Sequence, residues 1–146
     1  MKINIRTDSN VKETEISISC NRLTPEIEKL ISLVRIMDKQ ITGHKQGQIH
    51  FLNINEILYI DTVDKKTFYY TKADVYESQL RLYELEEQLE GTEFFRANKS
   101  CIANFTQIKS LKADLDGRIL LTMSNEEKLY VSRQYAPYVK KKLGVK

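Results

Sequence analysis

The sequence predicts a mainly β fold with short helices, α+β overall, in which a small N-terminal unit precedes a larger domain. From about residue 40 onward, short apolar or alternating runs follow one another with turn-forming residues between them, which is typical of strands. Apolar residues recur at helical spacing only in short segments. With 146 residues, of which 41% are hydrophobic and 29% are charged, the chain is long enough to bury a core.

Residues 1–39 are predicted to form a ββα extension. The segments KINIR (2–6) and ETEISIS (13–19) alternate for a few residues and predict strands, and the DSN between them favours a turn. Thr24 suits a helix N-cap and Pro25 the first helical position, and apolar residues then share one helix face. That face has to be covered, either by the rest of the chain or by a second copy. The extension is therefore a candidate dimerisation or regulatory unit.

Residues 40–146 are predicted to form the larger domain. Two apolar runs come first, followed by a hairpin, a short leucine helix and three more strands before a C-terminal helix. These elements cover, in order, residues 49–52, 57–60, 66–81 (the hairpin), 82–89 (the helix), 108–113, 118–123 and 128–132. The clearest turn between strands is DLDG at 114–117, because Asp-Gly favours tight hairpins.

Positive charge collects in the last third of the chain. Residues 1–90 carry 12 Lys and Arg against 15 Asp and Glu, a net charge of −3, whereas residues 91–146 carry 11 against 5, a net charge of +6. Such a split indicates an anionic partner such as nucleic acid, although a basic segment can also be simply a solvated surface.

Motifs for catalysis are missing, so we expect no enzyme, no cofactor and no small-molecule substrate. The sequence has no phosphate-binding loop, dinucleotide-binding turn or nucleophile elbow. Asp61 and Asp64 flank a loop and are expected to be solvated, and His44 and His50 have no Ser or Cys nucleophile beside them. The two Cys and two His match no metal-ligand spacing, so no metal site is expected.

We expect a cytoplasmic protein with reduced, buried thiols, because Cys20 and Cys101 are far apart in the sequence. No run approaches the roughly 18 apolar residues that span a membrane. MKINIRTDSN lacks the long apolar segment of a signal peptide. The first 40 residues are too short for a phosphoreceiver domain, so control by a built-in aspartyl phosphorylation site is not expected.

The placement of cations remains as the functional signal. In FFRANKS (94–100), the two Phe can be buried and hold Arg96 and Lys99 in fixed positions, as a surface that binds phosphates requires. The other candidate cations are Lys65, Lys66 and Arg133. Alternatively, Arg96 or Lys99 pairs with a carboxylate from the acidic first half of the chain, and an exposed pair of that kind contributes only about 0–1 kcal/mol.

Three ordered blocks carry a resemblance to a known family. They are FLNINEILYID (51–61), LYELEEQLEGTEFFRANKSCIAN (82–104) and VSRQYAPYVKKKL (131–143). In order and spacing they resemble the LytTR DNA-binding domains of bacterial transcription regulators, over about residues 45–144. Residues 1–39 lie outside the resemblance, and the chain is similar to family members that carry a short N-terminal extension and no receiver domain.

The resemblance implies an elongated fold of stacked β-sheets whose loops, rather than a recognition helix, reach the DNA grooves. By position, it implies DNA contacts from eight residues: Lys65, Lys66, Arg96, Asn98, Lys99, Ser100, Arg133 and Gln134. Asn98 and Gln134 differ from the residues that are frequent there in the family, which bears on base preference, although Gln can bond an adenine edge. Asn104 is expected to shape its turn and not to touch a base.

The leading hypothesis is a non-enzymatic, sequence-specific transcription regulator that binds double-stranded DNA. The resemblance implies a homodimer on imperfect direct repeats, with a membrane protein as a further partner. The alternative is an interaction module that docks a partner, such as a membrane sensor, through the helix over 27–37. Single-stranded RNA stacking on Phe68, Tyr69 and Tyr70 is a further alternative, against the simpler assignment of these side chains to the sheet core.

Overall fold

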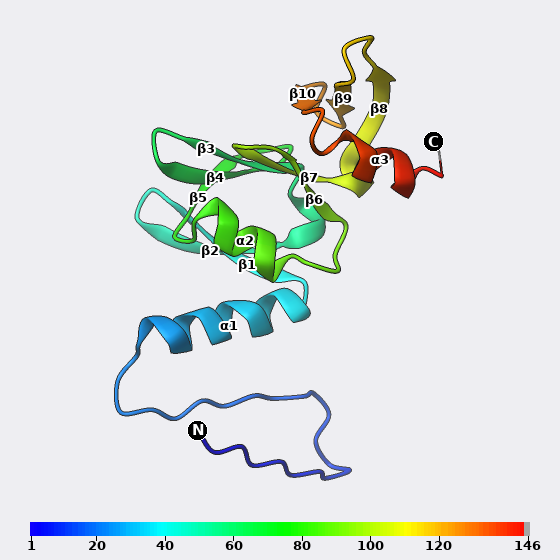
Figure 1. Cartoon of the computed structure of the whole chain (residues 1–146). Coiled ribbons are helices and arrows are strands. Elements are labelled where there is room, and N and C mark those ends of the chain that lie inside the picture. Colours follow the sequence, from blue (N-terminus) through cyan, green and yellow to red (C-terminus); the bar gives the residue numbers. More distant parts are fainter. Residues whose placement is uncertain (145–146) are drawn as a thin grey trace.

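The structure is a computed structural model and describes residues 1–144. A seven-stranded and a three-stranded antiparallel sheet lie together with three helices (Figure 1), which confirms the mainly β prediction. The strand orders are β2-β1-β5-β4-β3-β7-β6 and β10-β9-β8. The strands are β1 (Gln40–Lys45), β2 (Gln48–Asn53), β3 (Tyr59–Val63), β4 (Lys66–Tyr70), β5 (Val75–Ser78), β6 (Phe94–Asn98), β7 (Cys101–Asn104), β8 (Ile108–Ala113), β9 (Ile119–Met123) and β10 (Lys128–Val131). The helices are α1 (Pro25–Met37), α2 (Leu82–Gln88) and α3 (Ala136–Lys142).

Helix α1 begins where the sequence predicts. The Thr24 hydroxyl accepts a hydrogen bond from the backbone N–H of Ile27 at 3.3 Å, and Pro25 occupies the first helical position. The helix packs on the rest of the chain: Ile36 is 4% exposed in the core, and the Ser32 hydroxyl donates to Gln88 of α2 at 2.9 Å. The same chain covers part of the predicted apolar face, since Ile27, Leu30, Ile31 and Val34 are half-buried and Met37 is 78% exposed. Cover by a second copy stays a prediction.

The two strands predicted over 2–6 and 13–19 are absent, and this part of the prediction is wrong. The predicted turn does form, since the backbone N–H of Val11 bonds the carbonyl of Asp8 at 3.0 Å. Neither Ser9 nor Asn10 has a positive φ, so the turn is not of type I′ or type II′, the two types whose twist matches that of a two-residue hairpin. The two segments run in opposite directions beneath α1 without a ladder (Figure 1).

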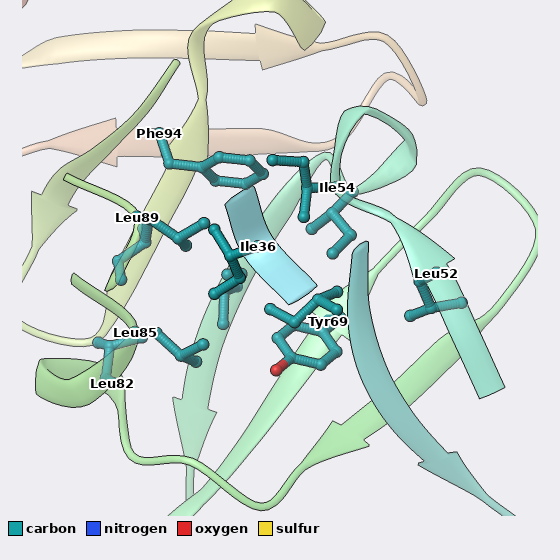
Figure 2. Packing of buried hydrophobic residues seen from close by; sticks show 12 residues of the cluster. Ile36, Leu52, Ile54, Tyr69, Leu82, Leu85, Leu89 and Phe94 are labelled. Atoms are coloured by element: carbon teal, nitrogen blue, oxygen red, sulfur yellow. The ribbon is translucent and has the colours of Figure 1, made fainter. Parts of the chain in front are cut away.

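Two hydrophobic cores lie on opposite sides of the large sheet. The first core, drawn in Figure 2, joins α1 and α2 to one face and includes Phe94 and Ile102. The second core joins the other face to the small sheet and α3, and includes Phe95 and Ala103. Successive residues of β6 and β7 thus alternate between the two cores, as the period of a strand requires. The β6–β7 hairpin is held from both sides.

Candidate nucleic-acid interface

Three turns that carry predicted site residues lie side by side along one edge of the molecule. The β3–β4 turn adjoins the β6–β7 turn, because the N–H of Thr62 donates to the carbonyl of Ser100 at 2.9 Å. The segment after β10 adjoins β6, because the N–H of Ser132 donates to the carbonyl of Ala97 at 2.9 Å. Backbone hydrogen bonds therefore connect segments that are far apart in the sequence.

The β3–β4 turn presents Lys65 and Lys66 to solvent. Asp64 and Lys65 both have a left-handed backbone, with φ of 52° and 67°, which is the conformation of a two-residue hairpin turn with a tight right-handed twist. Both lysines are exposed, and neither forms an ion pair among residues 1–144. Their ammonium groups are free to meet an anion.

In the β6–β7 turn, Asn98 supports the backbone and Lys99 is exposed. The Asn98 side-chain N–H donates to the carbonyl of Tyr130 at 2.8 Å, and its carbonyl oxygen accepts from the N–H of Ser100 at 3.0 Å and the hydroxyl of Ser100 at 3.1 Å. The Asn98 amide is thus already engaged within the protein. A direct contact from Asn98 to a base would require these bonds to break.

Arg96 is placed differently from Lys99. Its side chain is 16% exposed, and its Nη1 lies 4.0 Å from a carboxylate oxygen of Glu86 in α2. Arg96 shares the strand face of Phe94, so α2 covers it, and its Nε and Nη1 have no hydrogen-bond partner in the described chain. The alternative of a carboxylate neighbour therefore holds for Arg96, whereas Lys99 forms no ion pair within residues 1–144.

Arg133 and Gln134 are exposed just after β10, and the β8–β9 turn lies beside them. A Cβ placed on Gly117 would lie 3.1 Å from Cγ of Arg133. The aliphatic part of Arg133 therefore packs over the turn at a position where a side chain on residue 117 would crowd it. Gly117 has a φ of +90°, which also favours glycine. The backbone N–H of Arg118, its side chain and, more weakly, Arg133 hold the pKa of Asp116 below its ordinary value.

Sequence reasoning missed Arg118. Its guanidinium lies 4.6 Å from the centre of the Tyr130 ring, and its Nε lies 2.8 Å from a carboxylate oxygen of Asp116. The Asp-Gly turn before it was predicted, but no local pattern indicates that this turn meets the end of β10. Asn104 shapes its turn as expected, since it is buried, donates to the carbonyl of Ile57 at 2.9 Å and accepts from the N–H of Thr106.

Behind the turns lies a buried group of titratable side chains. Burial raises the pKa of Asp61, and a hydrogen bond from Tyr70 opposes this rise. Burial raises the pKa of Cys101 to about 12, so its thiol stays protonated at neutral pH.

Cys20, in contrast, is exposed, so the expectation that both thiols are buried is wrong for this residue. Tyr69 is 1% exposed and belongs to the sheet core, not to a stacking platform.

Two further features of residues 1–144 bear on their chemistry. No set of three or more His, Cys, Asp or Glu within residues 1–144 is arranged to hold a metal ion. None of the helices in that range has the length and apolar character needed to cross a bilayer. The three helices are separated by strands, so these residues contain no helix-turn-helix.

We define the basic edge as Lys65, Lys66, Lys99 and Arg133, the exposed cations of the three adjoining turns. Comparison with known proteins gives this edge a context. A family model of the LytTr DNA-binding domain matches residues 47–144 and so includes all four. The LytTr DNA-binding domain of a protein described as a methyl-accepting/DNA response regulator from Bacillus cereus superposes with a TM-score of 0.68. It is 29% identical and covers 73% of this chain and 97% of its own.

Full-length relatives occur in Staphylococcus aureus. Uncharacterized HTH-type transcriptional regulators from the strains NCTC 8325 / PS 47 and bovine RF122 are each 29% identical over 147 residues. In both comparisons the match covers 99% of this chain and 99% of the relative, so the similarity includes the N-terminal extension.

Proposed function

Because the chain belongs to the LytTR family of DNA-binding domains, we propose that it regulates transcription by binding double-stranded DNA through the basic edge. One observation carries the proposal: three hydrogen-bonded turns along one side of the molecule expose four cations that form no ion pair among residues 1–144. Fixed cations at several separations suit a phosphate backbone, whose contacts supply most of the sequence-independent affinity.

Residues of the site have different roles in this proposal. Lys65, Lys66 and Lys99 contact phosphates as point charges, whereas Arg133 and Gln134 are long enough and suitably branched to bond base edges in the major groove. Asn98 and Ser100 position Lys99, and the hydroxyl oxygen of Ser100, which only donates within the protein, can still accept a hydrogen bond from a bridging water. Arg96 supports the site indirectly, because it holds α2 near β6 through Glu86.

We further propose that two protomers bind together on imperfect direct repeats, and that the protein works in the cytoplasm. A membrane protein remains a candidate partner for signal input, as does a protein docked on the outer side of α1. None of these partners requires catalytic chemistry from the chain.

A gel-shift titration tests the proposal. The duplex is the DNA upstream of the protein's own gene, compared with an unrelated duplex at two salt concentrations. We expect tight, salt-sensitive binding to the first duplex, and Lys99→Ala should weaken it about tenfold because one fixed phosphate contact is lost. Lys109→Ala is the matched control, since Lys109 pairs with Glu126 at the opposite end of β8. Equal binding to both duplexes, or equal loss in both variants, would contradict the proposal.

A further inference from the structure

The N-terminal arm, defined as residues 1–22, exposes more apolar surface than an isolated protomer needs. Its Ile3, Ile5, Ile16 and Ile18 are 77%, 86%, 63% and 41% exposed, although they alternate with polar residues as in a strand with one buried face. The two legs of the arm are residues 2–6 and 13–19. Neither leg contributes to either core.

The legs carry opposite charges on their polar faces. Lys2 and Arg6 alternate with isoleucines in the first leg, and Glu13 and Glu15 precede isoleucines in the second. None of the four forms an ion pair among residues 1–144. Opposite charges directly across a pair of antiparallel strands are stabilising, and like charges there are destabilising.

The legs do not pair with each other within one chain, since residues 1–24 contain no strand. The turn between them closes through the carboxylate and carbonyl of Asp8, which accept from the N–H groups of Asn10 and Val11. Its central residues, Ser9 and Asn10, lack the positive φ of a two-residue hairpin turn. Each leg consequently keeps its backbone N–H and C=O groups unpaired and open to another strand.

We propose that the arms of two copies exchange legs, so that the positive leg of each copy pairs with the negative leg of the other. Two paired strands alone are marginal in water, so the isoleucines of each pair need an apolar surface to cover them. The isoleucine face would lie toward α1, beneath which the arm runs (Figure 1). The pairing is symmetric, as in most homodimers.

The exchange specifies the dimer surface and does not depend on DNA binding. Residues 20–24 connect the second leg to α1 without belonging to a helix or strand.

Charge reversal tests the exchange on full-length protein without DNA, with mass measured by analytical ultracentrifugation. Lys2→Glu/Arg6→Glu makes both legs acidic, and Glu13→Lys/Glu15→Lys makes both basic. We expect each variant alone to dimerise more than about tenfold more weakly than the wild type, and an equimolar mixture to recover a 1:1 heterodimer. Glu87→Lys/Glu90→Lys, on exposed positions in and just after α2, is the matched control and should dimerise like the wild type.

A second variant tests the turn independently of charge. Ser9→Asn/Asn10→Gly installs Asn-Gly, which favours the tight hairpin turn and should close the legs within one chain. We expect a monomer with increased strand signal in circular dichroism. A monomeric wild type, reversed-charge variants that dimerise normally, a mixture that does not recover the dimer, or an Asn-Gly variant that dimerises undiminished would each overturn the proposal.

Discussion

At the scale of single residues, Asn98 connects an exposed cation of the site, Lys99, to the packed strands. Its amide joins β10 to the turn that carries Lys99, through one bond donated to Tyr130 and two accepted from Ser100. The position of Lys99 therefore depends on a neighbour that has no charge. A search for charged residues alone would overlook this dependence.

Asn98→Ala should lower both stability and DNA affinity. Loss of the three bonds should reduce the free energy of unfolding by about 1–3 kcal/mol, measured by urea denaturation. Asn98→Asp keeps the acceptor for Ser100 but loses the donor to Tyr130, so its stability should be intermediate. If Asn98→Ala unfolds at the same urea concentration as the wild type, the supporting role of Asn98 is wrong.

Asp61 gives a pH dependence with a defined sign. Because burial raises its pKa above the ordinary 3.8, the folded state binds this proton more tightly than the unfolded state does. The stability contributed by Asp61 is therefore complete below its ordinary pKa and is lost as the pH rises through the raised value. One of its carboxylate oxygens is buried without a partner, which adds to the cost of ionisation.

Asp61→Asn should consequently stabilise the protein at neutral pH. The gain in free energy of unfolding over the wild type should grow as the pH rises from the ordinary pKa of 3.8 toward neutrality. Urea denaturation of both proteins across this pH range measures the difference. A difference that stays constant with pH would show that Asp61 has the same pKa in the folded and unfolded states.

At the scale of elements, strong local patterns located most strands, and tertiary contacts decided the rest. The predicted strands at 108–113, 118–123 and 128–132 correspond to β8, β9 and β10 within one residue at each end. Strand β1 was missed because QITGHK has little apolar character. Its Gly43 is required by a neighbour, since a Cβ there would lie 2.7 Å from Cβ of Tyr76.

The candidate site was predicted as a set of residues but not as an arrangement. Sequence resemblance named the cations, but it could not show that Arg96 shares the covered face of Phe94. The strand period and an irregularity in pairing between Arg96 and Asn98 decide which side chains are covered. Such an irregularity depends on the partner strand, so it leaves no local signal.

Helix α1 is an integral part of the first core, and one residue tests this. Ile36 is 4% exposed, whereas its neighbour Met37 is 78% exposed. Ile36→Ala should lower the free energy of unfolding by about 2–5 kcal/mol, because it leaves a cavity under the helix. Met37→Ala should change it by less than about 0.5 kcal/mol. Similar losses in both variants, measured by urea denaturation, would show that α1 is not packed as described.

At the scale of the whole molecule, the basic edge gathers exposed positive charge in a chain whose first 90 residues carry a net charge of −3. The three lysines of the basic edge that contact phosphates predict a slope of about −3 per protomer in a plot of log affinity against log salt concentration. Lys65→Ala/Lys66→Ala should reduce this slope by about 2 and weaken binding equally for all sequences. Arg133→Ala should instead reduce the ratio of the affinity for operator DNA to the affinity for unrelated DNA. An unchanged slope in the double variant would remove the β3–β4 turn from the interface.

The hairpin tips contribute no side chain to either core, and this separation bears on how such a regulator evolves. Substitutions at Lys65, Lys99 or Gln134 leave the packed layers of β6 and β7 untouched. Related regulators can therefore come to recognise different promoters through a few substitutions in these turns while the fold stays the same. Asn98 is the exception, because altering it would disturb both recognition and architecture at once.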